Sequence, residues 1–78
     1  MKGEIGFVKA NVYRFKILEI LNKEQMDKNK ISKKLRIREK LVEKTLSELE
    51  IKKLIKKENR SYKITEKGKK IFNQLRQF

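Results

Sequence analysis

The order of structural signals between Asn29 and Gly68 constrains the fold of this chain more than any other feature. Two helix-like segments lie on either side of Arg36-Ile37-Arg38. A hairpin pattern then covers residues 54–65, and Thr65 is a residue type that begins helices. This order predicts a mostly helical α+β domain, with a three-helix core, a two-stranded hairpin and a C-terminal helix.

The spacing of apolar residues predicts one more helix before this region. Residues 1–10 are compatible with a short strand, a helical turn or a packed arm. Asn11 is an N-cap candidate, and after it apolar residues recur at three- and four-residue intervals, as on the buried face of a helix. They are Val12, Phe15, Ile17, Leu18, Ile20 and Leu21. This helix is expected to end near residues 22–25.

A helix-turn-helix is expected over residues 27–53. Asp27 is the N-cap candidate of its short first helix, and Ile37 is expected to be buried in the turn. The second helix of the pair, the third predicted for the chain, covers about residues 38–53. Its inner line consists of Val42, Thr45, Leu46 and Leu49.

The hairpin and the last helix complete what we expect to be a single domain over residues 1–78. Glu58-Asn59-Arg60 is a polar turn, and the alternation over residues 61–65 is typical of a half-buried strand with Tyr62 in the core. The last helix is expected over about residues 66–77. Its apolar face consists of Ile71, Phe72, Leu75 and Phe78.

Positive charge is spread through the chain and is highest in the helix-turn-helix and the hairpin. The formal net charge is +13, and residues 27–57 contain twelve Lys and Arg against five Asp and Glu. A basic excess on a folded domain is typical of proteins that bind polyanions. The alternative is a lysine-rich surface that serves only solubility.

The absence of His and Cys excludes several kinds of chemistry. The chain has no disulfide, no thiolate metal site and no imidazole to act as general base or ligand. No apolar run approaches the roughly 20 residues of a membrane span, and the start lacks a signal-peptide pattern. We therefore expect a cytoplasmic protein that is not an enzyme and has no catalytic residue, cofactor or metal.

Four short patterns in a fixed order carry a family resemblance. They are Asn11-Val12-Tyr13-Arg14 followed by Ile17, Leu18 and Leu21; ISKKLRI from Ile31; Val42, Leu46 and Leu49 followed by Lys53-Leu54-Ile55; and YKITEKG from Tyr62. Residues 11–70 thereby resemble stand-alone archaeal winged helix-turn-helix regulators of the MarR and PadR type. The resemblance implies a winged helix-turn-helix fold, with the hairpin as the wing, and a sequence-specific double-stranded DNA-binding transcriptional regulator.

Two positions depart from this family's pattern. Arg36 and Lys53 stand where the family often has glycine, which permits a positive φ angle. Both changes add positive charge on the side expected to face DNA, and both leave the local turn geometry open.

The family's docking mode implies which residues contact DNA. The third helix enters the major groove, and the wing contacts the adjacent minor groove or the backbone. The expected contacts are Lys40, Leu41, Lys44 and Ser47 on that helix; Lys28, Lys30, Arg36 and Arg38 on the preceding helix and turn; and Lys57, Asn59, Arg60 and Lys63 on the wing. For Leu41, contact with a thymine methyl and burial in a core or dimer contact are equally open.

Glu39 and Glu43 are the acidic residues near this surface, and they argue against purely nonspecific binding. Each could accept a hydrogen bond from cytosine, or each could form an i,i+4 pair with a nearby lysine of the same helix.

A homodimer is expected because one winged helix contacts few base pairs. The expected interface comprises Ile5, Phe7 and Val8 with Ile71, Phe72, Leu75 and Phe78. The alternative is that the last helix only closes the monomer core. Two other functions stay open: a nonspecific chromosome-coating protein, and a winged-helix module that binds a protein or RNA.

Overall fold

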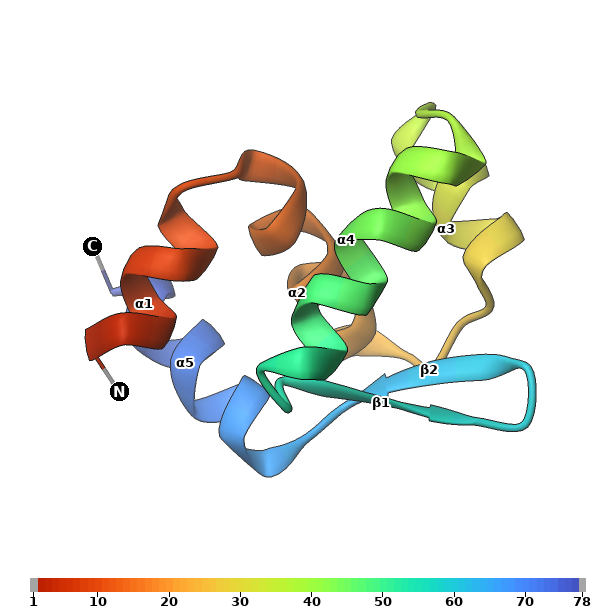
Figure 1. Ribbon diagram of the computed structural model, residues 1–78. Coiled ribbons are helices and arrows are strands. Elements are labelled where there is room, and N and C mark those ends of the chain that lie inside the picture. The colour runs from red at the N-terminus through yellow and green to blue at the C-terminus, as the bar shows by residue number, and fades with distance from the viewer. Residues whose placement is uncertain (1, 78) are drawn as a thin grey trace.

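The computed structural model describes residues 2–77, which form five helices and one antiparallel hairpin (Figure 1). In chain order the elements are α1 (Lys2–Lys9), α2 (Val12–Lys23), α3 (Lys28–Leu35), α4 (Glu39–Ile51), β1 (Ile55–Glu58), β2 (Ser61–Ile64) and α5 (Glu66–Arg76). The expected mostly helical α+β class is confirmed. Helices α2, α3 and α4 form the three-helix core, and the helix expected to be the third is α4.

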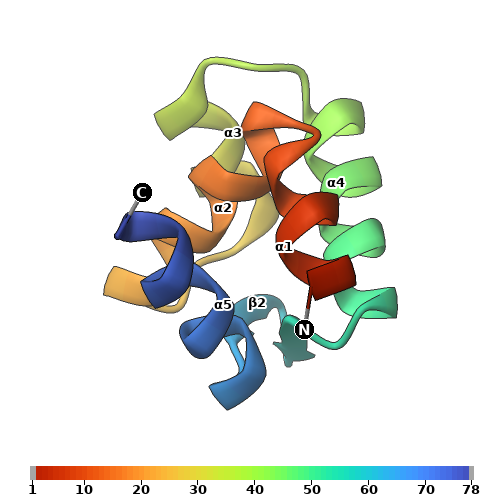
Figure 2. The same ribbon diagram turned by 90° about the vertical axis from the view of Figure 1, so that its left-hand side faces the viewer.

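The segment left open by the sequence forms helix α1. It packs against α2 and α5, as Figure 2 shows, and its Val8 is fully buried. Glu4 forms an ion pair with Lys67 of α5 at 3.2 Å, and a hydrogen bond from Lys67 is the main reason that the pKa of Glu4 falls to about 2. Helix α1 is therefore held by contacts with distant segments.

Three helices begin at the N-caps expected from the sequence. The side chain of Asn11 accepts a hydrogen bond from Tyr13 N at 2.9 Å, and that of Asp27 accepts one from Lys30 N at 2.8 Å. Thr65 Oγ1 accepts one from Gly68 N at 3.0 Å. Each cap satisfies a backbone donor that the helix itself leaves unpaired.

The hydrophobic core lies among the five helices and the hairpin. Its buried residues include Ile17, Leu18, Ile31, Leu46, Leu49, Leu54, Ile55 and Ile71. Tyr62 is 9% exposed, as expected, and Ile37 is only partly buried against this core.

The hairpin is anchored beside the start of α3. Met26 and Tyr62 exchange two backbone hydrogen bonds, of 3.1 and 2.8 Å, and form an isolated antiparallel bridge. In the hairpin, Lys57 pairs with Tyr62 and Lys56 pairs with Lys63. Because successive residues of a strand point to opposite faces, Lys57 and Tyr62 share the face toward the domain, while Lys56 and Lys63 share the other.

The dimer interface expected on the apolar face of α5 is corrected by the structure, because the centre of this face is not available to a second copy. Ile71 is fully buried and Phe72 is 2% exposed, and the Phe72 ring stacks on Phe15 of α2 at a centroid distance of 5.3 Å. Helix α5 thus closes the monomer core. Leu75 is partly buried, and Phe78 lies outside the described residues.

Beside the end of α5 the described residues leave an apolar hollow of about 300 Å³. Its lining is Val8, Lys9, Val12, Phe15 and Leu75. Val12 is 58% exposed there. No helix within residues 2–77 has the length and apolar character needed to cross a membrane.

Candidate nucleic-acid interface

Helix α4 presents a narrow line of exposed side chains to solvent. Val42, Thr45, Leu46 and Leu49 form its buried face. Lys40, Lys44, Ser47 and Ile51 are exposed and follow one another at four-, three- and four-residue intervals, so they lie one above the other on the opposite face. Neither lysine forms an ion pair within residues 2–77. Ile51, which sequence reasoning did not include, is 77% exposed.

The acidic flank of α4 is paired with α3. Lys28 Nζ lies 2.6 Å from a Glu43 carboxylate oxygen and 3.8 Å from one of Glu39. The hydrogen bond between Lys28 and Glu43 lowers the pKa of Glu43 and raises the pKa of Lys28. Both carboxylates therefore have a lysine partner, but it comes from the neighbouring helix rather than from α4 itself.

The other flank of α4 faces α2. Leu41 is half-buried there, so it stands beside the exposed line rather than on it. Glu48 forms an ion pair with Arg14 of α2 at 3.2 Å. Of the residues of α4 expected to contact DNA, Lys40, Lys44 and Ser47 are thus exposed, and none of them has an ion pair with another helix within residues 2–77.

The turn between α3 and α4 carries two exposed arginines. Arg36 has left-handed backbone, with φ 56° and ψ 44°, and Arg38 occupies the N-cap position of α4 without a capping side-chain hydrogen bond. Ser32 Oγ donates a hydrogen bond of 2.6 Å to Ile37 O and so holds the turn. Lys30, in the first turn of α3, is exposed.

Lys53 also has left-handed backbone, with a φ of 62°. Both positions at which the family often has glycine therefore use the conformation for which glycine is favoured. A side chain with a Cβ atom in this region is strained by contact with its own backbone.

The hairpin divides its charged residues between two faces. Asn59 and Arg60 are exposed at its turn, where Asn59 has a φ of 57°. Lys63 lies 3.6 Å from Glu58, an ion pair on the face away from Tyr62. Lys57 lies over the Tyr62 ring, with its Nζ 5.8 Å from the ring centroid.

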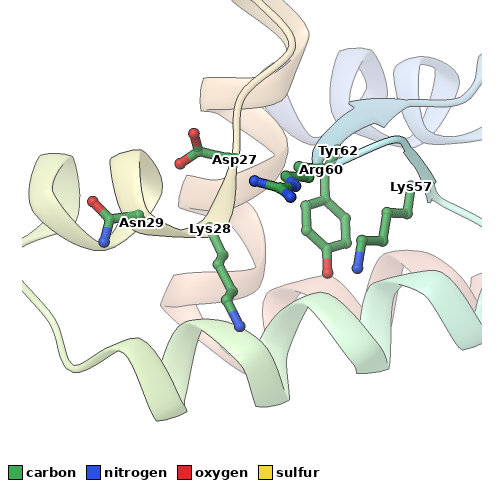
Figure 3. Close-up of a pocket in the computed structure, with 6 residues that line it drawn as sticks. All are labelled: Asp27, Lys28, Asn29, Lys57, Arg60 and Tyr62. Carbon is green, nitrogen blue, oxygen red and sulfur yellow. The ribbon is translucent and has the colours of Figure 1, made fainter.

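A hollow of about 250 Å³ separates the start of α3 from the hairpin (Figure 3). It is lined by Asp27, Lys28, Asn29, Lys57, Arg60 and Tyr62. Figure 3 shows the side chains of Lys28, Lys57 and Tyr62 pointing the same way, toward α4. Burial raises the pKa of the Tyr62 hydroxyl, and nearby Glu50 raises it further. The hydroxyl therefore stays neutral at physiological pH.

The hollow brings together three of the expected contacts, Lys28, Lys57 and Arg60, which sequence spacing alone does not connect. Asp27, Asn29 and Tyr62 also line it, and sequence reasoning had not named them as part of the site. Lys63 lies apart from this group, on the other face of the hairpin. Within residues 2–77, no cluster of acidic side chains is suited to hold a metal ion.

Comparison with known proteins adds one positive result. A family model described as "Winged helix-turn-helix" matches residues 9–78. No curated protein matches the chain significantly. No solved structure does so either.

Proposed function

The chain belongs to the winged helix-turn-helix family, a family of DNA-binding domains, and on this premise we propose that it is a sequence-specific transcriptional regulator. It acts on double-stranded DNA, without catalysis, and works on the nucleoid in the cytoplasm. Helix α4 enters the major groove, and the wing contacts the adjacent minor groove or the backbone.

One observation carries this proposal: the exposed line of α4 bears two lysines, and neither forms an ion pair with a described carboxylate. Lys40 and Lys44 can donate to guanine O6 and N7 or to phosphate, and Ser47 can donate or accept. The acidic flank beside them is already paired with Lys28, so its repulsion of phosphate is reduced. Leu41, half-buried beside the line, contacts a thymine methyl group.

The remaining expected residues supply contacts to the DNA backbone. Lys30 lies in the first turn of α3, Arg36 and Arg38 lie in the turn before α4, and Lys57, Asn59, Arg60 and Lys63 belong to the wing. Neutralising about six phosphates gives a log–log slope of affinity against salt of roughly −5. Arg60, exposed at the hairpin turn, is suited to a narrow minor groove, where the negative potential is enhanced.

We also propose that two copies bind a two-fold symmetric site. The centre of the α5 face is used inside the monomer, so the contact uses the hollow around Val12 and Leu75 together with Ile5 and Phe7 of α1. Sedimentation equilibrium tests this directly. If the measured mass is that of one chain at high protein concentration, both with and without DNA, the dimer is excluded.

Selection from a random double-stranded DNA library at two salt concentrations tests the function. The proposal predicts an enriched motif at the higher salt concentration, with two half-sites if the dimer forms. Tight binding without an enriched motif points instead to a chromosome-coating protein, which the carboxylates beside the α4 line disfavour. No binding at physiological salt excludes both DNA functions and leaves a protein or RNA partner.

A further inference from the structure

Arg14 connects three helices through one side chain. It lies in the first turn of α2, and its Nη1 donates a hydrogen bond of 2.7 Å to Phe7 O of α1. Its Nε donates a hydrogen bond of 3.2 Å to Glu48 Oε1 of α4. The guanidinium carbon lies 3.9 Å from the centroid of the Phe7 ring.

These contacts hold the guanidinium on two edges and one face. The Arg14 side chain is 17% exposed and that of Glu48 is 28% exposed, so solvent screens the pair less than a surface ion pair. Because a guanidinium is planar and rigid, the carbonyl of α1 determines where it can meet Glu48. Lysine, with one rotatable ammonium group, cannot make the same combination of contacts.

Glu48 stands next to the residues proposed to contact DNA. It follows Ser47 directly and lies four residues, about one helical turn, after Lys44. The pair draws Glu48 toward α2 and so restrains the rotation of α4 about its own axis, which the buried face of the helix also limits. That rotation decides the direction in which Lys40, Lys44 and Ser47 point.

We propose that Arg14 is a positioning residue for DNA recognition, and that through it α1 is part of the unit that reads sequence. This inference rests on the proposed function, because it assigns a role in the same interface. Arg14 itself does not contact bases. It fixes the geometry of α4, and recognition of base edges requires side chains held to within roughly 0.5 Å.

A purely electrostatic role makes a different prediction. In that case Arg14 would only neutralise a carboxylate near phosphate, and removing the carboxylate would help DNA binding. Glu48→Gln separates the two roles, since it removes the negative charge and leaves Arg14 only a weaker, neutral acceptor. Positioning predicts a loss of base discrimination for Glu48→Gln, whereas charge neutralisation predicts tighter binding to every duplex.

The experiment compares Arg14→Gln, Glu48→Gln and the double variant. The readout is the ratio of Kd values for a scrambled duplex and for the selected duplex, at a temperature where every variant is folded. Each single variant is expected to lower this ratio about threefold to tenfold. The double variant should lose no more than the worse single variant, because both changes break one interaction.

A matched control addresses loss of stability alone. Ile71→Val removes one methylene from the core in α5, outside the helix-turn-helix and the wing, and should lower the melting temperature without changing the Kd ratio. A role in stability only would make Arg14→Gln behave in the same way. An unchanged ratio in Arg14→Gln, or a raised affinity for all duplexes in Glu48→Gln, overturns the proposal.

A second measurement needs no DNA and keeps this proposal separate from the proposed function. Backbone amide NMR spectra of free Arg14→Gln should show shifts along the whole of α4 and in α1, well beyond the neighbours of residue 14. Shifts confined to the neighbours of residue 14 would overturn the positioning role, even if the wild type selects a motif. If these shifts along α4 occur but the protein selects no DNA motif, Arg14 still positions α4, and the proposed function as a sequence-specific regulator is rejected.

Discussion

At the scale of single residues, the backbone geometry of a few positions lowers the stability of the protein. Arg36, Lys53 and Asn59 are the described residues other than glycine with positive φ angles. Asparagine tolerates this region, but a long side chain does so at a cost of roughly 1–2 kcal/mol. At Arg36 and Lys53 the chain therefore has a cation where glycine would be less strained.

Lys53→Gly is expected to stabilise the protein. Relief of the left-handed strain exceeds the added entropy of the unfolded chain, which leaves a gain of about 0.5–1 kcal/mol. Urea unfolding measures it as a higher midpoint with an unchanged slope. Asn59→Gly is the control and should change stability much less. A lower midpoint for Lys53→Gly would show that its side chain contributes more than the strain costs.

Gly68→Ala is expected to destabilise the protein by about 1–3 kcal/mol, the usual cost of overpacking. A Cβ atom at this position would overlap the Leu54 carbonyl oxygen and lie 2.7 Å from Ile64 Cγ1. Gly6→Ala in α1 is the matched control, because its Cβ would meet no atom within 4 Å. The control should be neutral or stabilising in thermal unfolding. Equal melting temperatures for the two variants would contradict the close packing of α5 on the hairpin.

At the scale of elements, the contact between α3 and α4 combines packing with charge. Lys28 holds Glu43 and Glu39 on the side of α4 that faces the wing. These ion pairs are exposed, so they contribute little to stability. Their importance lies in the electrostatic potential that DNA meets.

Lys28→Ala is expected to weaken DNA binding more than Lys30→Ala. Both variants remove one positive charge from α3, but only the first also leaves two carboxylates without their partner. Titration of a labelled duplex at constant salt measures the difference. Adding Glu43→Gln to Lys28→Ala should restore part of the affinity. Equal losses in the two lysine variants would mean that the acidic flank does not face the DNA.

The elements also show what the sequence could not predict. The local sequence does not determine the structure of α1, because Gly3 and Gly6 lower its intrinsic helix propensity. Burial of Val8 against distant helices stabilises it. The amphipathic pattern of α5 predicted an apolar face but not its partner, which is Phe15 of the same chain. Periodicity identifies a face to be covered, whereas only the tertiary structure shows what covers it.

At the scale of the whole molecule, the fold was predictable because local signals agree with one another. The caps at Asn11, Asp27 and Thr65, the apolar periodicity and the polar hairpin turn all point to the same element order. The site was less predictable, since its geometry depends on pairs far apart in sequence. The Lys28–Glu43 and Arg14–Glu48 pairs have no local signature, and the DNA contacts themselves stay predictions.

The central claim is that the exposed line of α4 reads DNA, and one comparison of affinities tests it most directly. The double variant Lys40→Ala, Lys44→Ala is compared with Lys16→Ala, Lys70→Ala, which removes the same charge from exposed positions on α2 and α5. The measurement is Kd for the selected duplex and for a scrambled one. We predict that only the α4 variant loses the preference for the selected duplex, while the control weakens both slightly and equally. Equal loss in the two variants would contradict the account, because it would mean that net charge alone governs binding.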